Sequence, residues 1–328
     1  MRIKNTLVVA LLFTLATIQP VFATTNYVLN IRSSADYARI PDSDSLDLVS
    51  TSFTLEAWIN PSTFTSTDGA IISKRRVDGG SSYHLSISRF GAPSGQKSKV
   101  VLGMNNGGSA PQGLNYGLFT EAVIQSNAWY HVAGTYDRES NMARVYINGE
   151  LKASERVVLA LPLQNSSFPV TIGQMSLTGE PRPFIGLIDE ARVWNRALSQ
   201  AEVQTQMSLR LTGQEPGLVG YWNFDDNSIK DKSVYRNDST LVGAAQLVGD
   251  PLLLLPVRPQ LKGMKLSVLR GFQYAIVGES GQTYTLEGSE DLQQWTSLTD
   301  VKSTNVVSVF LEPTATNQVY RFYRARLR

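Results

Sequence analysis

The 328-residue sequence contains few side chains that could act as nucleophiles, general bases or soft metal ligands. It has no cysteine, which excludes disulfides, thiol nucleophiles, iron–sulfur clusters and cysteine zinc sites. Its two histidines, His84 and His131, cannot supply a three-histidine metal site. Each lies in an alternating, strand-like pattern without a nucleophile beside it, so we expect both to be structural residues. The scarcity of such groups predicts that the protein is not an enzyme.

The first 23 residues have the order of a secretory signal peptide. Arg2 and Lys4 precede an apolar run from Leu7 to Ile18, and a small residue, Ala23, marks the expected cleavage site. The run is about 12 residues long, shorter than the roughly 20 needed to span a bilayer. We therefore expect bacterial-type export to the extracellular space or cell surface, with no membrane span after signal removal. An uncleaved membrane anchor is the alternative.

Removal of the expected signal peptide would change the net charge of the chain. The whole sequence has 30 basic and 28 acidic residues, and 42% of its residues are hydrophobic, as in a globular protein. Both basic residues of the signal would be removed, which leaves equal numbers of each sign. A neutral chain has no global electrostatic field to hold nucleic acid or acidic lipid. Nucleic acid is therefore not an expected partner.

Alternation of apolar and polar residues from Tyr27 onward predicts an all-β fold. In the segment 52–59 it places four residues on one face: Phe53, Leu55, Ala57 and Ile59. Further strands are expected at residues 82–87, 129–136, 143–147, 170–173, 184–189 and 191–194. Asn148-Gly149 predicts a type I′ hairpin turn, because both central positions need positive φ. Ser199 and Glu202 form the capping box of one short helix.

The composition changes near Gly249, where a segment rich in proline and leucine begins. We expect a first domain over residues 24–249, a linker over 250–262, and a small second module over 263–328. Strands are expected in that module at residues 272–277, 283–287, 306–311 and 319–327. This pattern predicts a small Ig-like or fibronectin-type β-sandwich.

Five ordered sequence blocks carry a resemblance to a known family. They are residues 34–41 (SADYARIP), 52–61 (SFTLEAWINP), 129–137 (WYHVAGTYD), 145–149 (VYING) and 184–199 (FIGLIDEARVWNRALS). Through these blocks the stretch 26–245 resembles the laminin-G-like branch of the concanavalin A-like lectin/glucanase superfamily. The resemblance implies a two-sheet antiparallel jelly roll that binds carbohydrate or protein, at its rim loops or on its concave sheet.

Two further segments resemble known families. A sixth block, Glu215–Asp225, also looks like the family, and we interpret residues 215–245 as the closing strands of one domain, with a truncated second copy as the alternative. The C-terminal residues 281–295 and 321–327 are similar to a small β module that ends many secreted bacterial proteins.

The same resemblance allows a check for glycosidase chemistry. Glucanases of the superfamily place two acids around an aspartate on one strand, since retaining hydrolysis needs two carboxyl groups about 5–5.5 Å apart. Here the residues two before and two after Asp189 are Leu187 and Ala191, both apolar. The paired carboxylates are missing, and hydrolysis is not expected.

Some members of the family hold a structural calcium ion. By resemblance, Asp36 and Asp189 stand where such a calcium ion, which prefers oxygen ligands, would be bound. The alternative is that Asp189 hydrogen-bonds backbone or Arg192 and that Asp36 caps a loop. Only one acid stands in the first block, where the family usually has two, which favours the structural alternative.

Ligand-binding residues are expected in loops that the family pattern does not fix. Tyr116 and Phe119 follow a loop containing two asparagines and two glycines, whereas Arg75, Arg76 and Asp78 occupy another. Aromatic rings pack on sugar faces while polar groups orient hydroxyls. We therefore predict a secreted, non-catalytic binding protein for carbohydrate or an extracellular protein surface. The alternatives are a structural or adhesion component without a small ligand, and an atypical glycosidase.

Overall fold

The computed structural model describes fourteen segments of the chain: residues 26–64, 68–75, 81–88, 97–105, 115–157, 163, 165–175, 181–249, 260–267, 271–277, 282–289, 294–302, 307–312 and 322–328. The predicted signal peptide and the predicted ligand residues Arg76 and Asp78 lie outside them. In the described part, no helix is long and apolar enough to cross a membrane.

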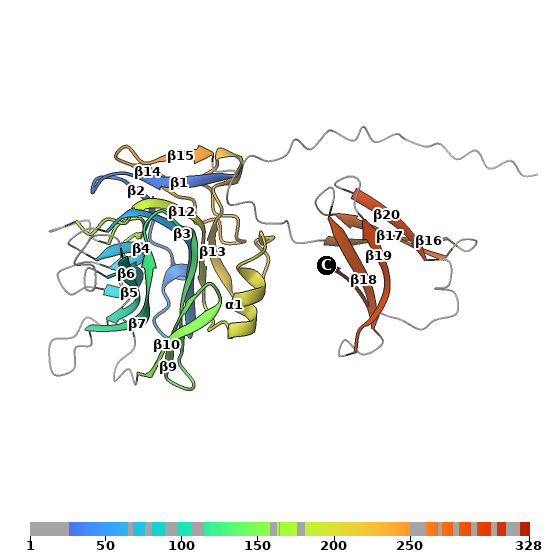
Figure 1. The fold of residues 1–328 in the computed structure, drawn as a ribbon, viewed down its shortest axis with the longest axis horizontal. Helices are drawn as coiled ribbons and strands as arrows, with labels where there is room; N and C mark the ends of the chain where they lie inside the picture. The colour runs from blue at the N-terminus through green and yellow to red at the C-terminus, as the bar shows by residue number, and fades with distance from the viewer. Residues whose placement is uncertain are drawn as a thin grey trace, which may run out of the picture.

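Two antiparallel sheets build the first domain (Figure 1). Sheet A has the order β10-β9-β8-β3-β12-β1-β15, with β13 also paired to β12. Its strands are β1 (Tyr27–Ile31), β3 (Phe53–Thr63), β8 (Tyr130–Asp137), β9 (Met142–Ile147), β10 (Glu150–Arg156), β12 (Ile185–Trp194), β13 (Leu218–Trp222) and β15 (Gln246–Gly249). Sheet B has the order β14-β2-β11-β4-β5-β6-β7. Its strands are β2 (Tyr37–Ile40), β4 (Gly69–Arg75), β5 (Ser81–Ile87), β6 (Lys97–Asn105), β7 (Asn115–Gln125), β11 (Val170–Ile172) and β14 (Thr240–Val242).

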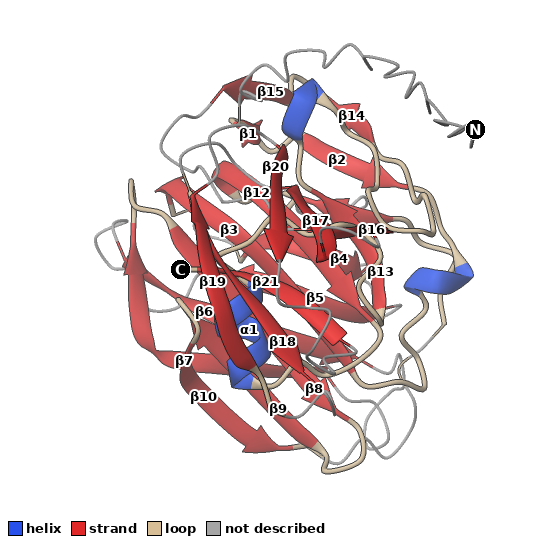
Figure 2. Ribbon diagram, turned by 90° about the vertical axis from the view of Figure 1, so that its right-hand side faces the viewer, coloured by secondary structure: helices blue, strands red, loops and turns tan. Residues whose placement is uncertain are grey.

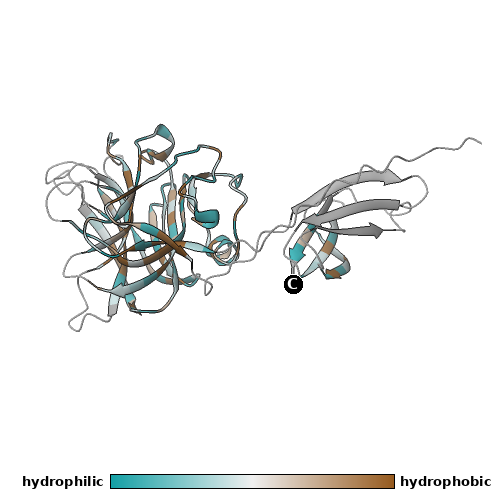
Figure 3. Cartoon of the chain, turned by 90° about the horizontal axis from the view of Figure 1, so that it is seen from above, coloured by the Kyte–Doolittle hydropathy of each residue, from teal (hydrophilic) through white to brown (hydrophobic). Residues whose placement is uncertain are grey.

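The main core lies between these sheets, and the predicted alternation of β3 is confirmed. Phe53, Leu55, Ala57 and Ile59 are fully buried in one cluster with residues of sheet B such as Leu85. Figure 3 shows hydrophobic residues along the strands of both sheets. The arrangement is the predicted two-sheet jelly roll.

Two local predictions are also confirmed. Asn148 and Gly149 join β9 to β10 with φ of 51° and 72°, as a type I′ turn requires. The helix α1 (Gln200–Gln206) begins after Ser199, whose side chain accepts from the Glu202 backbone while Glu202 accepts in return. Helix α1 is the only α-helix of the described residues, and Figure 2 shows it among the strands; the other helical turns are η1 (Asp44–Leu46) and η2 (Asp225–Asn227).

A second, smaller apolar cluster covers the outer face of sheet A. It is formed by Ala133, Tyr146, Trp194, Leu198, Val203, Leu211, Leu218 and Tyr221. Several of these residues come from α1 and its flanking loops, residues 195–217, which we call the cover segment. Because of this cover, the β3 residues that point away from the main core are buried too, among them Thr54 and Glu56.

The segment after the cover completes the same domain. Strand β13 pairs with β12, β14 with β2, and β15 with β1. Residues 215–245 therefore supply closing strands to both sheets, as the sequence indicated.

The C-terminal residues form two three-stranded antiparallel sheets, with the orders β16-β17-β20 and β19-β18-β21. The strands are β16 (Gln260–Ser267), β17 (Gly271–Val277), β18 (Thr283–Ser289), β19 (Thr296–Lys302), β20 (Val307–Glu312) and β21 (Phe322–Leu327). Strand β16 begins inside the stretch expected to be linker, and it and β19 were not among the predicted strands. The Arg324 guanidinium carbon lies 4.1 Å from the centre of the Trp295 ring.

Candidate functional site

The outer face of sheet B carries two aligned rows of side chains that cross β5, β6 and β7. In one row His84 pairs with Gly103, which pairs with Gly117; in the next, Ser86 pairs with Val101, which pairs with Phe119. Tyr83 and Leu85 of β5 point into the main core. Since successive side chains of a strand alternate between faces, His84, Ser86 and their row partners point outward.

The glycines of the first row leave room for aromatic rings. A Cβ added at Gly103 would overlap the imidazole of His84, so that ring lies across β6 where a side chain would otherwise stand. A Cβ added at Gly117 would lie 3.1 Å from the ring of Phe119. The rings of His84 and Phe119 therefore lie against the two paired glycine positions.

Three serine hydroxyls on this face have no hydrogen-bond partner. Ser73, Ser82 and Ser86 are each at most 1% exposed, and the hydroxyl oxygen of each is buried and unpaired. Ser73 pairs with His84 in the sheet register, which places it in the first row. A buried hydroxyl without a partner costs about 1–3 kcal/mol, so a group of three is not explained by stability. Each could donate one and accept two hydrogen bonds.

The two aromatic residues predicted to bind a ligand lie on opposite faces of β7. Phe119 is 40% exposed on the outer face of sheet B. Tyr116 pairs with Met104, a core residue, and its hydroxyl donates to Glu155 Oε2 of β10 at 2.7 Å. Burial, together with this carboxylate, raises the pKa of Tyr116 well above its ordinary value. Of these two residues, only Phe119 lies on the outer face of sheet B, in the row of Ser86 and Val101.

The third group of predicted ligand residues is only partly described. Arg75 ends β4, where its backbone pairs with Ser81. Arg76 and Asp78 lie outside the described residues. All three stay predictions, as do Tyr116 and Phe119.

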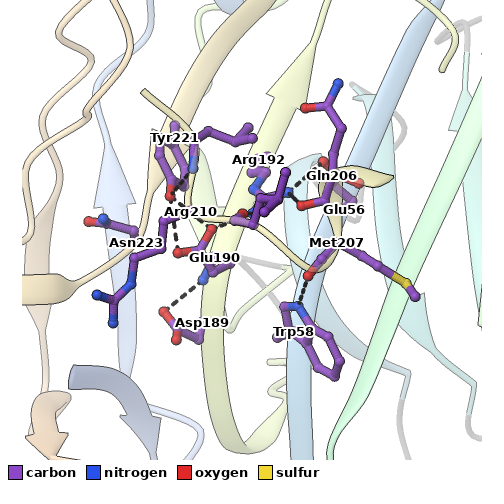
Figure 4. Close-up of polar contacts among 12 residues, drawn as sticks. Glu56, Trp58, Asp189, Glu190, Arg192, Gln206, Met207, Arg210, Tyr221 and Asn223 are labelled. Atoms are coloured by element: carbon purple, nitrogen blue, oxygen red, sulfur yellow. Dashed lines mark hydrogen bonds and ion pairs between the residues drawn. The ribbon is translucent and has the colours of Figure 1, made fainter. Parts of the chain in front are cut away.

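The outer face of sheet A holds a different kind of polar cluster, centred on Arg192 (Figure 4). This fully buried guanidinium donates through Nη1 to Glu56 Oε1 at 3.3 Å and to the Gln206 carbonyl at 3.0 Å. Through Nη2 it donates to Glu190 Oε2 and to the Leu209 carbonyl, the latter at 2.8 Å. Two of these partners belong to the cover segment, so Arg192 ties that segment to sheet A.

Glu56 is the second centre of this cluster. Its Oε1 accepts from Trp194 Nε1 at 3.0 Å, and its Oε2 lies 3.3 Å from Nε2 of His131. Burial raises the pKa of Glu56, but the His131 hydrogen bond and the Arg192 charge outweigh it and lower the value to about 2. His131 is thus a buried structural residue, as expected. Trp58 adds another tie, because its Nε1 donates to the Met207 carbonyl at 2.8 Å.

The acidic block 189–190 of β12 belongs to this buried scaffold. Glu190 has φ of 51° at a bulge, where β12 has one residue more than β3 between Asp189 and Arg192. Its carboxylate accepts from the Tyr221 hydroxyl at 2.8 Å. Asp189 and Glu190 are at most 2% exposed. The block therefore places no accessible carboxyl pair on β12 for retaining hydrolysis.

The two aspartates predicted to hold calcium have other partners. Asp36 accepts backbone N–H groups from Arg32 at 3.2 Å and Ala244 at 2.7 Å. Burial raises its pKa, but these hydrogen bonds outweigh that effect and lower it. Asp189 accepts from the Glu190 backbone at 2.8 Å and Asn26 Nδ2 at 3.3 Å. Burial, with the charges of Glu190 and Asp225, raises the pKa of Asp189 well above its ordinary value, which favours the neutral form.

These contacts do not fit a shared calcium site. The partners of Asp36 and Asp189 differ, and among the described residues no group of three or more acids and histidines could hold a metal ion. Calcium binding stays a prediction, which a comparison of melting temperatures in millimolar calcium and in chelator would test.

The fold and these two faces define a jelly-roll protein with one outer sheet face closed by its own chain. The chain belongs to the concanavalin A-like lectin/glucanases superfamily, because the Laminin_G_3 family model matches residues 32–204. A comparison with curated proteins gives no match.

Solved structures share the fold at low identity. A Bacteroides ovatus protein proposed to bind carbohydrate has a TM-score of 0.53 and 23% identity; the match covers 70% of this chain and 61% of that one. A heptameric SAP-like pentraxin from Limulus polyphemus has a TM-score of 0.41 and 19% identity, with coverage of 55% and 81%. Domain 4 of an extracellular arabinanase from Geobacillus stearothermophilus, solved with arabinotriose, has a TM-score of 0.40 and 21% identity, with coverage of 54% and 75%. The chain thus spans about three fifths of the Bacteroides protein, and at 23% identity that likeness shows the fold alone.

Proposed function

We propose that the protein is a secreted, non-catalytic carbohydrate-binding protein that holds a glycan on the outer face of sheet B. The observation that carries the proposal is the ring of Phe119, which is 40% exposed on the outer face of sheet B. A sugar presents hydroxyl groups at its edge and CH groups on its ring face. The phenyl ring supplies an apolar surface for the CH groups, as aromatic side chains do in ligand sites.

The spacing of these groups suits an oligosaccharide. Ser86 and Phe119 occupy the same row, separated by the single strand β6. Neighbouring strands lie about 4.8 Å apart, so the two residues are about 10 Å apart across the sheet. This span suits a ligand of two or more sugar units lying across β5, β6 and β7.

Export agrees with this role, because extracellular and cell-surface glycans are outside the cytoplasm. The expected signal peptide over residues 1–23 is the support for it. Detection of the mature protein in a culture supernatant or on the cell surface, with an N-terminus after Ala23, would test this part separately.

The binding proposal is tested with a glycan array of neutral oligosaccharides, followed by calorimetric titration of the strongest hits. Phe119→Ala should lower the affinity for a hit at least tenfold. Val123→Ala is the matched control, because Val123 lies on the same strand and is 41% exposed. It should leave the affinity unchanged.

The serine positions sharpen the test. Ser86→Ala should raise the midpoint of urea unfolding, because it removes a buried hydroxyl that has no hydrogen-bond partner. An array without hits, combined with a reproducible protein partner in pull-downs, would replace this proposal by the adhesion alternative. Equal losses for Phe119→Ala and Val123→Ala would remove Phe119 from the site.

A further inference from the structure

A cavity of about 590 Å³ lies on the other side of the jelly roll, on the outer face of sheet A. Its floor is the β9–β10 hairpin, with Arg144, Tyr146 and Leu151. One wall is the start of the cover segment, from Arg196 to Glu202, and the opposite wall includes Asp137. The volume falls within the range of about 300–1,000 Å³ that is usual for small-molecule sites.

Three of the four charged residues that line this cavity already have partners. Arg196 Nη1 lies 2.6 Å from Glu202 Oε1, and Glu202 Oε2 also accepts from the Ser199 backbone at 2.8 Å. Asp137 Oδ1 accepts from the Glu139 backbone at 3.1 Å. The hydrogen bond from Ser140, which outweighs burial, lowers the pKa of Asp137 and keeps its carboxylate charged.

Arg144 is the exception. Within the described part of the chain, it makes no hydrogen bond and no ion pair, although it is half-buried. Its neighbours across the sheet are Thr135 on β8 and Ser154 on β10, both neutral. A guanidinium presents five N–H donors in a planar fork that matches a carboxylate in bidentate geometry. The cavity therefore contains one unneutralised cation with its full hydrogen-bonding capacity available.

The other residues that line the cavity restrict which chemical groups its ligand can carry. Asp137 and Glu202 repel a bare anion, but their carboxylates have remaining lone pairs that accept from hydroxyl groups. Leu151, which is 43% exposed, provides an apolar surface. A ligand that satisfies all of these groups has one carboxylate, several hydroxyls and a compact ring with an apolar face.

We propose that this cavity is a second binding site, for a uronic acid, with Arg144 as the residue that binds the carboxylate. The site is on the opposite sheet from the glycan face around Phe119 and does not depend on it. A chain with both sites would bind an acidic polysaccharide through one uronic acid residue at sheet A and a neutral stretch at sheet B.

The test is calorimetric titration of the full-length protein with D-glucuronate, D-glucose and acetate. Glucuronate should bind, glucose and acetate should bind at least tenfold more weakly, and added salt should weaken glucuronate binding. Arg144→Gln should lower the glucuronate affinity at least tenfold, with little change in melting temperature because the Arg144 side chain makes no hydrogen bond or ion pair among the described residues. Arg144→Lys should give an intermediate affinity, since lysine keeps the charge but loses the bidentate fork.

Arg156→Gln is the charge-matched control. Arg156 ends the same hairpin, is exposed, and does not line the cavity. Equal losses for Arg144→Gln and Arg156→Gln would show a diffuse electrostatic effect and overturn the proposal, as would equal affinities for acetate and glucuronate. Phe119→Ala should leave glucuronate binding intact, which separates this outcome from failure of the site on sheet B.

Discussion

The two sheets of the jelly roll use their outer faces in opposite ways. On sheet A, the cover segment buries a charged cluster in which Arg192 has four oxygen partners, two of them backbone carbonyls of that segment. On sheet B, three serine hydroxyls are buried without any partner and Phe119 is exposed. The first face pairs its charged groups with the protein's own chain, although atoms such as Arg192 Nε and Gln206 Oε1 have no hydrogen bond there, whereas the second face exposes an aromatic ring.

This difference predicts which substitutions affect stability and which affect binding. A buried cluster whose charged groups bind backbone carbonyls of a segment holds that segment in one position. Unsatisfied groups lower stability, and proteins keep them chiefly at functional sites. We therefore expect substitutions on the inner cluster of sheet A to act on folding, and substitutions on the face of sheet B to act on binding.

The largest expected effect is that of Arg192→Met. It leaves Glu56 and Glu190 buried without their cation, and breaking a buried charge cluster in this way costs about 3–5 kcal/mol of the free energy of unfolding. Urea unfolding followed by tryptophan fluorescence measures it. Arg39→Met is the control, because Arg39 is exposed on sheet B, where its backbone pairs with Thr171.

The Arg39 control should change the free energy of unfolding by less than about 0.5 kcal/mol. A loss of similar size for both variants would contradict the contrast between the sheets. If Arg192→Met yields no folded protein, Arg192→Lys should give a folded but destabilised one, since it keeps the charge without the planar fork.

The second effect is the pH dependence that Glu56 of sheet A contributes. The pKa of Glu56 is about 2 in the folded protein against an ordinary value of 4.5, because His131 and Arg192 outweigh the effect of burial. A lowered pKa stabilises the fold above the unfolded value, and this contribution is lost as the pH falls from about 4.5 to about 2. It amounts to about 3 kcal/mol.

Urea unfolding at a series of pH values between 7 and 2 checks this expectation. Glu56→Gln should be less stable at pH 7 and should lose less stability on acidification than the natural protein. Asp137→Asn is the comparison, since Asp137 also has a lowered pKa but ends strand β8 outside the buried cluster. A parallel acid dependence in the natural protein and Glu56→Gln would assign the effect to other carboxylates.

Much of the fold could be predicted from the sequence because its signals are local. The alternation of β3, the Asn148-Gly149 turn and the Ser199 capping box depend on neighbours within a few residues, and all three are confirmed. The cover segment was not predicted, because burial of the second face of β3 depends on residues about 140 positions further along the chain, as in the contact of Thr54 with Arg196.

The candidate site was predictable only in part. Tyr116 and Phe119 were predicted as ligand residues of a loop, but both lie on strand β7, where Phe119 is exposed and Tyr116 lies on the core side and binds Glu155. The alternating Ser82, His84 and Ser86 indicated a polar strand face, but nothing local shows which hydroxyls stay unpaired. The row of His84, Gly103 and Gly117 exists only through strand pairing, and no pattern within any one of the three strands contains it.

The smallest effect concerns how the cover segment is held at its start. Ser199→Ala removes the side chain that accepts from the Glu202 backbone, and loss of an N-cap costs about 1 kcal/mol. Thr205→Ala is the matched control, because that hydroxyl donates to a carbonyl within the same helix and does not cap it. Thermal unfolding should show a lower melting temperature for Ser199→Ala only.

Because Arg192 and Trp58 hold the later part of the segment through the Gln206, Leu209 and Met207 carbonyls, the capping variant should loosen α1 without uncovering sheet A. Native-state hydrogen exchange would show this as faster exchange in α1 with unchanged protection of β3. Faster exchange in both would mean that the cap, rather than the buried charge cluster, holds the cover in place.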